Sequence, residues 1–473
     1  MGFYRFDSPY DWNRVAPYKE TAKKAPGGMI DLSVGSPVDP VPASVQRALA
    51  DAADAPNAYG YPTVVGMPAL RDAIAGWFRT NRGVDFEAID ADFVPTVGSK
   101  EGVALMASLL HFGPGDVIVQ PAVSYPTYEI GTQLAGAKAY KAADIADVDS
   151  WRCVPGVKAI WVNSPSNPTG EVLSASQLHG IVAAAREIGA VVLSDECYGL
   201  LTWADNNAAD GVNVAADNGQ PAKQPNDESF ENVVSRGASS VSRSLQSNDG
   251  EKRNSSSDAD SEPTSCVLQH GRGGVRDLSD GGEFSFASYA LQSNDTNEKD
   301  SMSCFSAPAP CMLQPDVCDG SAKGILVLYS LSKQSNMAGY RTALIAGDPD
   351  LVRPMTVYRK QIGEIIPGPV QAAMAVALQD SDAVKTQQAR YDKRLHQLVD
   401  GLRANGYDAR MPQGALYVWV RAKSGDCWQD MADLARLGIV ASPGEFYGDP
   451  THLRFSSTAT DASIAEVVAR LRG

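Results

Sequence analysis

Short apolar runs that alternate with helical segments between about residues 40 and 203 constrain the fold of this chain most strongly. The runs end in polar turn residues, and they comprise residues 116–120, 159–163, 190–194 and, much later, 325–330. Helical periodicity marks residues 68–79, 100–110 and 174–188. Strands that alternate with helices form a parallel sheet with both faces covered. The pattern therefore predicts an α/β fold whose ligand-binding groups gather where strands end.

Residues 206–306 interrupt this alternation. Serine accounts for 19 of these 101 residues, and the pentapeptide Leu-Gln-Ser-Asn-Asp occurs at both 245–249 and 291–295. A segment of this composition buries too little apolar surface to offset the entropy that it would lose on ordering. We therefore predict a low-complexity, disordered insertion.

The residues outside the insertion are expected to form two domains. Residues 46–205 and 307–395 are assigned to a large domain, and residues 1–45 and 396–473 to a smaller one. A long helical stretch at 370–405 comes after Pro367, and strand-like runs in the tail comprise residues 415–420 and 452–456.

Charge and cysteine content exclude several classes of protein. The formal net charge is -15, and no cluster of Lys and Arg interrupts it, so nucleic acid is not an expected partner. The seven cysteines never form a Cys-x-x-Cys pair, and the five histidines form no ligand motif, so we expect no metal and a reducing compartment. No signal-peptide core or spanning run of about 18 apolar residues is present. We expect a cytoplasmic protein that does not enter a membrane.

The strongest chemical motif follows the run 325–330. It reads Ser330-Leu-Ser-Lys333, with Gly339-Tyr-Arg341 soon after. A lysine at a strand end can form a Schiff base with an aldehyde when its amine is partly unprotonated. Ser330 and Arg341 supply a hydroxyl and a planar fork that suit a phosphate. Taken alone, Lys333 is more simply a solvated loop lysine.

Two further strand ends carry matching polar groups. Asp195-Glu-Cys-Tyr198 closes the run 190–194, and a turn that contains Asn167 closes the run 159–163. A carboxylate such as Asp195 can pair with a pyridinium nitrogen and make the ring an electron sink. Tyr198 and Asn167 can hydrogen-bond the oxygen on the same ring. An isolated Asp195 would instead be interpreted as a helix cap.

Together these motifs resemble the fold-type-I aminotransferases, which use pyridoxal 5'-phosphate. The agreement in residue type, order and, outside the insertion, spacing covers Asn167, Asp195, Tyr198, Ser330, Lys333 and Arg341. The resemblance implies an α/β fold of the PLP-dependent transferase type, with a mostly parallel seven-stranded sheet between helices in the large domain and a smaller α+β domain. It implies catalytic roles for Lys333, Asp195 and Tyr198.

The same resemblance implies further site residues. Ser99 and Lys100 open a helix where the family binds phosphate, and Tyr125 matches the aromatic residue that stacks on the cofactor ring. Binding of the substrate carboxylate is implied for Arg454, with Gly35 and Asn167. Tyr61 matches a tyrosine that reaches the neighbouring subunit's phosphate, which implies a homodimer with shared sites. An ordinary helix start, a turn and packed aromatic residues are the simpler alternatives for these positions.

Several stretches look closest to the succinyldiaminopimelate aminotransferases of high-GC Gram-positive bacteria (actinobacteria). These stretches are 31–40, 124–129, 331–341 and 443–448. The resemblance implies exchange of an amino group between an amino acid and a 2-oxo acid, namely N-succinyl-LL-2,6-diaminopimelate with 2-oxoglutarate and glutamate, in lysine and diaminopimelate biosynthesis. Three alternatives remain open: an aminotransferase for aspartate or aromatic substrates, a C–S β-lyase, and a cofactor-sensing regulator. Arg359 and Lys360 are candidates to bind the distal carboxylates, or a solvated helix face.

Overall fold

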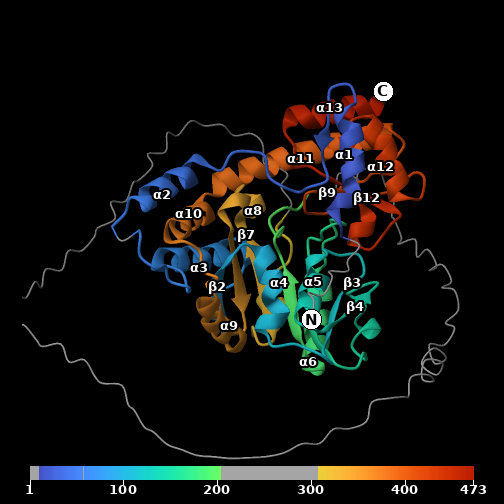
Figure 1. Ribbon diagram of the computed structural model, residues 1–473. Coiled ribbons are helices and arrows are strands. Elements are labelled where there is room, and N and C mark those ends of the chain that lie inside the picture. Colours follow the sequence, from blue (N-terminus) through green and yellow to red (C-terminus); the bar gives the residue numbers. More distant parts are fainter. Residues whose placement is uncertain (1–9, 57, 204–306) are drawn as a thin grey trace, which may run out of the picture. The chain divides into compact units, whose positions relative to one another are not determined.

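The computed structural model describes residues 10–56, 58–203 and 307–473, so the predicted insertion lies outside the described residues. A seven-stranded sheet with the order β2-β8-β7-β6-β5-β3-β4 forms its centre (Figure 1). β8 is antiparallel to both of its neighbours, and the other pairs are parallel. The strands are β2 (Asp92–Val97), β3 (Val117–Pro121), β4 (Lys138–Ala142), β5 (Val157–Asn163), β6 (Val191–Asp195), β7 (Ile325–Ser330) and β8 (Thr342–Gly347). The predicted α/β class is confirmed.

The apolar runs predict four of the seven strands, β3, β5, β6 and β7, but not the buried strands β2 and β8. β7 matches its predicted range, and the ends of β3, β5 and β6 agree within two residues. β4 was not predicted because its edge position leaves Lys138 and Lys141 exposed, so it has no continuous apolar run.

Helices cover both faces of the sheet, as parallel strands require. α3 (Pro68–Arg82), α6 (Ala175–Glu187) and α10 (Gly368–Gln379) pack into one apolar cluster, and α4 (Ser99–Leu109), α5 (Thr127–Leu134) and α9 (Pro349–Ile362) into another. α6 begins at a capping box in which Ser174 and Gln177 each bond the other's backbone N–H. α2 (Ala43–Ala53) packs on α10.

The helical stretch predicted at 370–405 is confirmed, but it is not continuous. The structure has two helices there, α10 and α11 (Ser381–Ala404), separated by Asp380 with φ -87° and ψ 74°. The Asp380 carboxylate accepts from the Ala383 N–H at 3.0 Å and from the Ser44 hydroxyl at 2.5 Å. Asp380 therefore caps α11, and a cap with apolar periodicity on both sides does not disturb the pattern.

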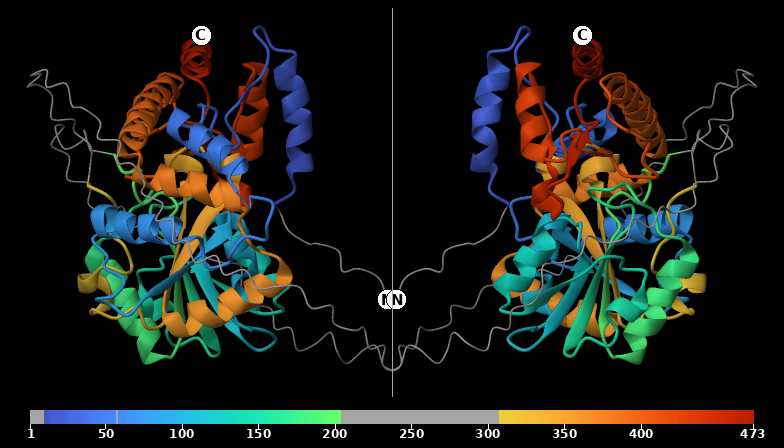
Figure 2. Two further views of the ribbon diagram at one scale, coloured as in Figure 1. Left: turned by 90° about the vertical axis from the view of Figure 1, so that its left-hand side faces the viewer. Right: turned by 90° about the vertical axis from the view of Figure 1, so that its right-hand side faces the viewer.

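A third apolar cluster combines the first described residues with the C-terminal part of the chain. It contains the antiparallel sheet β11 (Ser442–Pro443), β12 (His452–Ser456) and β9 (Tyr417–Arg421), and the parallel pair β1 (Ile30–Asp31) and β10 (Ile439–Val440). Helices α1 (Ala16–Lys23), α12 (Cys427–Arg436) and α13 (Asp461–Arg472) cover these strands, and α1 lies beside α12 (Figure 2). The predicted domain boundaries stay a prediction.

The ends of the two described segments that flank residues 204–306 are bonded to each other. Thr202 donates to the Ala307 carbonyl at 2.8 Å, and the Ala309 N–H donates to the Gly199 carbonyl at 2.9 Å. Arg82, fully buried, donates to Ala309 and pairs with Glu196 at 2.7 Å. A buried ion pair and backbone bonds thus close this junction.

Within the described ranges, no helix has the length and hydropathy to cross a membrane.

Candidate active site

One pocket of about 290 Å³ collects the predicted site residues. The carboxyl ends of β5, β6 and β7 form its floor, and β12 and the segment after β1 contribute from the C-terminal cluster. Eleven of the twelve residues predicted from the sequence line it: Gly35, Ser99, Lys100, Tyr125, Asn167, Asp195, Tyr198, Ser330, Lys333, Arg341 and Arg454. The expectation that ligand groups gather at strand ends accounts for this arrangement.

Lys333 lies in the middle of the pocket on α8 (Leu331–Gln334), directly after β7. Its Nζ donates to the Gly35 carbonyl. Burial, with help from the positive charges of Arg454 and Arg341, lowers the pKa of Lys333 to about 8. A substantial fraction of the amine is therefore neutral near physiological pH, which a nucleophilic lysine requires.

The Asp195 carboxylate closes the pocket at the end of β6. It accepts from the Tyr128 hydroxyl at 2.9 Å and from the Cys197 N–H at 3.2 Å. Asn163 donates to the Asp195 carbonyl at 2.8 Å and holds the backbone. Burial raises the pKa of Asp195. A buried carboxylate of this kind is stabilised by a cationic partner such as a protonated ring nitrogen.

Tyr198 lines the same pocket, and its hydroxyl is hydrogen-bonded to that of another tyrosine. The Tyr198 and Tyr417 hydroxyl oxygens lie 2.8 Å apart. A methyl group on Gly35 would overlap the Tyr417 hydroxyl, so the close approach of the backbone requires glycine at that position. The pocket therefore has a fixed pair of phenol groups, one of which packs against the segment that carries Gly35.

Arg454 is a buried cation without an acidic partner. Its side chain projects from β12, and only 4% of the residue is exposed. One terminal nitrogen donates to the Asn167 side-chain oxygen and the other to the Ser33 carbonyl, both at 2.7 Å. The rings of Tyr417 and Tyr447 lie 4.1 and 4.7 Å from the guanidinium. Within the described part of the chain, Nε has no hydrogen-bond partner and no carboxylate lies within ion-pair distance.

The other end of the pocket is built to hold an anion. Gly98, with φ 78°, precedes α4, so the first N–H groups of that helix and the side chains of Ser99 and Lys100 face the pocket. The Arg341 guanidinium lies against Gly98, where any side chain would overlap it. Ser330, at the end of β7, lines the same end. These donors fit a phosphate, and Asp195 fits the ring nitrogen of pyridoxal phosphate.

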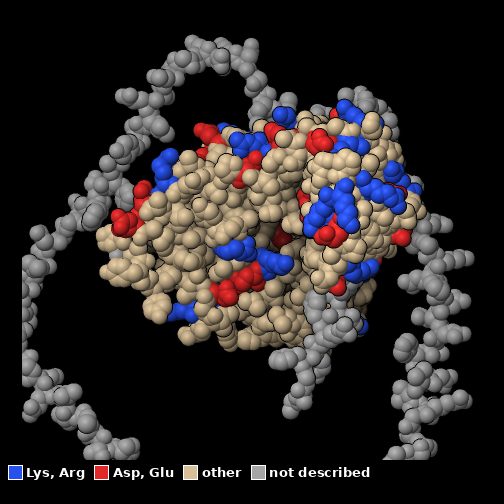
Figure 3. Space-filling view, turned by 45° about the horizontal axis from the view of Figure 1, so that its top comes forward, with Lys and Arg blue, Asp and Glu red and all other residues tan. Residues whose placement is uncertain are grey.

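Charge in the pocket differs from charge on the surface. Lys and Arg lie among Asp and Glu over the face drawn in Figure 3, and surface pairs include Arg14–Glu445 at 2.7 Å. The pocket is lined by four basic side chains, Lys100, Lys333, Arg341 and Arg454, and one acidic side chain, Asp195. In a chain with net charge -15, this local excess of positive charge indicates a ligand with several negative charges.

Three residues considered in the sequence do not line this pocket. Tyr61 is 104% exposed, so its predicted contact with a neighbouring subunit stays a prediction. Arg359 was a candidate for the distal carboxylates, but it is buried and forms a bidentate pair with Glu101 at 2.7 and 2.8 Å. Lys360 is exposed on the same helix. The assignment of Arg359 to substrate is therefore wrong, because its charge is already neutralised.

Other pocket residues were missed. Tyr10, Trp12, Cys197, Tyr417 and Tyr447 line the pocket but were not predicted as site residues. Cys197 lies inside the predicted Asp195–Tyr198 motif, so position alone could have identified it. Tyr447 lies in the stretch 443–448 that carries part of the resemblance, whereas Tyr10, Trp12 and Tyr417 come from segments with no motif of their own, and only the tertiary structure brings these three to the pocket.

Comparison with known proteins identifies the group to which the chain is related. The family described as aminotransferase class I and II matches residues 27–221 and 302–471. The chain is 32% identical to 4-dedimethylamino-4-oxo-anhydrotetracycline transaminase OxyQ of Streptomyces rimosus, over 98% of each chain. A protein of Mycobacterium tuberculosis named as a probable aminotransferase is 31% identical over 98% of this chain and 84% of its own. A solved structure of a probable N-succinyldiaminopimelate aminotransferase from Thermus thermophilus is similar with a TM-score of 0.68 at 19% identity, covering 98% of this chain and 99% of that one.

Proposed function

The chain belongs to the class I and II aminotransferase family, and we propose that it transfers an amino group between N-succinyl-LL-2,6-diaminopimelate and 2-oxoglutarate. The family depends on pyridoxal phosphate, which is therefore the cofactor. The succinylated substrate is supported by the four sequence stretches at 31–40, 124–129, 331–341 and 443–448. The name given to the similar Thermus thermophilus protein adds support of the same kind.

The buried, unpaired guanidinium of Arg454 is the observation that best supports the transfer of an amino group from an amino acid. An enclosed arginine whose neighbours are Asn167, the Ser33 carbonyl and tyrosine rings has no counter-charge of its own. A substrate α-carboxylate would supply that charge and accept hydrogen bonds in place of water. The carboxylate would then place the substrate Cα toward Lys333, which is the group that must reach it.

We assign the following roles to the chain's own residues. Lys333 would hold the cofactor through its Nζ, and the same amine would move the proton at the substrate Cα. Bound pyridoxal phosphate supplies the ring that accepts the electron pair left at Cα. Asp195 would keep the ring nitrogen protonated, and Tyr198 and Asn167 would donate to the ring oxygen. Ser99, Lys100, Ser330 and Arg341 bind the phosphate.

A homodimer is part of the proposal. Tyr59 and Tyr61 are 93% and 104% exposed next to half-exposed Val65, so aromatic side chains project away from their own subunit. A second copy would cover this apolar group and give Tyr61 a phosphate to contact. Analytical ultracentrifugation at micromolar concentration is expected to give the mass of two chains.

The test of the substrate is amino-group transfer by the purified protein from glutamate to N-succinyl-2-amino-6-oxopimelate. We expect turnover at least about tenfold faster than with oxaloacetate or phenylpyruvate, which is the discrimination expected for one or two additional polar contacts. Faster turnover with phenylpyruvate would move the assignment to aromatic substrates. That alternative has support in the rings of Tyr10 and Trp12 at the pocket and in the relation to OxyQ.

The same preparation distinguishes the remaining activities. Release of pyruvate from cystathionine without a 2-oxo acid would indicate a C–S β-lyase. A stable cofactor absorbance without turnover on any 2-oxo acid would indicate a cofactor-sensing protein. Transfer to the succinylated acceptor, with release of 2-oxoglutarate in equal amount, excludes both.

A further inference from the structure

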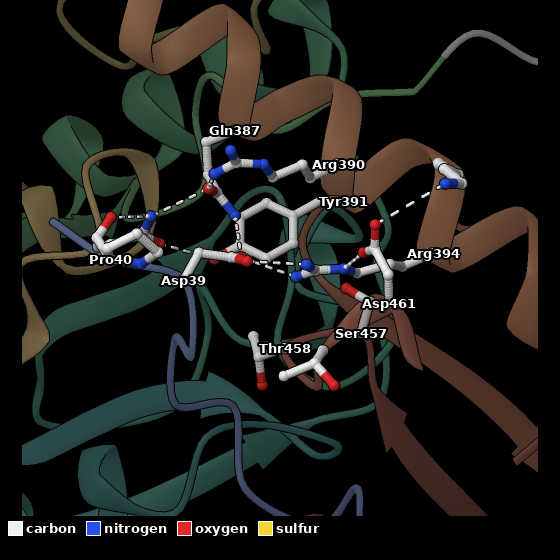
Figure 4. A network of polar contacts seen from close by, with 12 residues as sticks. Asp39, Pro40, Gln387, Arg390, Tyr391, Arg394, Ser457, Thr458 and Asp461 are labelled. Carbon is white, nitrogen blue, oxygen red and sulfur yellow. Dashed lines mark hydrogen bonds and ion pairs between the residues drawn. The ribbon is translucent and has the colours of Figure 1, made fainter. Parts of the chain in front are cut away.

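A network of polar side chains centred on Arg394 joins three segments of the chain (Figure 4). Arg394, on α11, donates its two terminal nitrogens to the Asp39 carboxylate at 2.7 and 2.8 Å and its Nε to Asp461 at 2.5 Å. The Arg394 side chain is 3% exposed and that of Asp39 is 12% exposed. A bidentate pair enclosed to this degree is strong, because little water competes for either partner.

Gln387 adds a second arm from the same helix. Its Nε2 donates to Asp39 at 2.8 Å, and its Oε1 accepts from Asn336 at 2.9 Å. Asn336 follows Lys333 closely and has φ 55°, in the left-handed region that non-glycine residues rarely adopt. The Tyr391 hydroxyl also donates to Asn336, at 3.3 Å. These bonds compensate the strain of the Asn336 backbone and hold the loop that follows Lys333.

Each segment in the network also carries a group of the active site. Asp39 closely follows Gly35, whose carbonyl accepts from Lys333. Asp461 begins α13, and the strand just before that helix, β12, carries Arg454. The segment between Gly35 and Asp39 and the segment between Arg454 and Asp461 are therefore both tied at one end to Arg394. The position of this arginine is set by the long helix α11.

We propose that Arg394 is a positioning residue for the substrate, which acts through Asp39 and Asp461 to set the separation between the Arg454 guanidinium and the Lys333 amine. Arg454 is expected to hold the substrate carboxylate while Lys333 reaches the adjacent Cα, so small errors in that separation weaken productive binding. The inference rests on amino-acid binding at Arg454 and does not depend on which amino acid is bound.

The charges around Asp39 support a persistent ion pair between Asp39 and Arg394. Burial acts to raise the pKa of Asp39, but the hydrogen bonds from Arg394 and Gln387 lower that pKa overall. Arg390 also contributes positive charge near Asp39 and donates to Gln387 at 3.2 Å. The carboxylate therefore stays ionised at neutral pH, and the bidentate pair persists under assay conditions.

The substitution Asp39→Asn tests the proposal, because the amide keeps the shape of the carboxylate but loses its charge. Two carboxylates that cannot react, glutarate and hydrocinnamate, serve as probes, and their Kd is measured from the absorbance of the bound cofactor. We expect two values to rise about tenfold: the Kd of the probe that binds the wild-type protein more tightly, and the KM of the amino donor. A tenfold change is the usual size of a coupling between a residue and a ligand that it does not touch. Cofactor content should not change, and kcat should fall by less than KM rises. Asp39→Glu, which keeps the charge, should recover part of the loss.

A matched control separates positioning from general stability. Arg186 donates to the Cys318 carbonyl at 3.1 Å and the Ser321 carbonyl at 2.7 Å, outside the pocket lining. Arg186→Gln should lower Tm while leaving Kd and KM unchanged.

Arg394→Gln combined with Asp39→Asn should weaken probe binding no further than the stronger single change. The proposal is overturned if Asp39→Asn changes Kd less than about twofold, or if Arg186→Gln has the same effect on Kd for an equal loss of Tm. Failure to transfer to the succinylated acceptor would contradict the proposed substrate and leave this result unaffected.

Discussion

The two ends of the pocket each present an arginine, but the two arginines are held in different ways. Arg454 is 4% exposed, lies between tyrosine rings, and donates to two neutral oxygens. Arg341 is exposed, and its guanidinium donates to the carbonyls of Ala338 at 3.0 Å and Val97 at 3.5 Å. The first guanidinium is enclosed by protein, and the second lies on an exposed residue.

This difference indicates that the two ends of the pocket would bind an anion in different ways. At the end proposed to hold the phosphate, Arg341 would act together with the N-terminus of α4 and the side chains of Ser99, Lys100 and Ser330, so several groups would share one anion. Among the described lining residues, Arg454 is the only cation apart from Lys333 that does not belong to this proposed phosphate site. Removal of Arg454 should therefore cost much more than removal of Arg341.

The largest effect is expected from Lys333→Ala, which removes the amine that both ends are arranged around. The amine is proposed to be the cofactor's attachment point and the base, so turnover should fall at least about 10⁴-fold. Single-turnover assays and the absorbance of the bound cofactor provide the measurement. Activity within tenfold of the wild type would contradict the role of Lys333. It would also remove the reason for comparing the two ends of the pocket.

The next largest effect is expected from Arg454→Leu. Loss of a buried, bidentate partner for a carboxylate costs about 4 kcal/mol, so kcat/KM for amino acids should fall about 10³-fold. Cofactor content, measured after denaturation, should stay that of the wild type because the phosphate end is intact. If amines without a carboxylate lose as much activity as amino acids, then Arg454 is not the carboxylate site.

A smaller effect is expected from Arg341→Gln. The remaining donors keep most of the phosphate contact, so the Kd of pyridoxal phosphate should rise by about 10- to 30-fold, the size of one charge-assisted hydrogen bond. Equilibrium dialysis measures the Kd. Excess cofactor should restore kcat/KM to near the wild-type value, and failure to restore it would show that Arg341 also serves the substrate.

The smallest effect concerns pH. Because the pKa of Lys333 is lowered to about 8, the neutral amine fraction rises as pH rises through that value. Uptake of pyridoxal phosphate by cofactor-free protein should therefore accelerate about fivefold between pH 7 and pH 8 and level off above pH 9. Arg454→Leu removes a nearby positive charge and should move the profile to higher pH. A profile that is flat from pH 7 to pH 9 would contradict the lowered pKa.

The sequence predicted those parts of the site that depend on local order. Asp195, Lys333 and Asn167 each follow an apolar run, and parallel strands bring their carboxyl ends to one edge, so their convergence followed from the sheet. Tyr417 could not be predicted in this way. It contacts Tyr198 across 219 positions of sequence, and strand β9 carries no motif that marks the contact.

Local patterns also failed where a single side chain overrides periodicity or charge. Asp380 ends one helix and caps the next, although the apolar pattern continues through both. Arg359 has the spacing of an exposed helical arginine, but Glu101 from α4 neutralises it in the interior. In both cases the deciding partner comes from a segment that sequence spacing does not place.

The bond between Thr202 and Ala307 has a consequence for how the chain can be divided. The part up to residue 203 carries β6 and Asp195, and the part from residue 307 carries β7 and Lys333, yet β6 and β7 pair along their length. Two separately expressed polypeptides that end and begin at this junction would each hold half of the catalytic apparatus. If each half were fused to one of two other proteins, amino-group transfer would report that those two proteins bind each other.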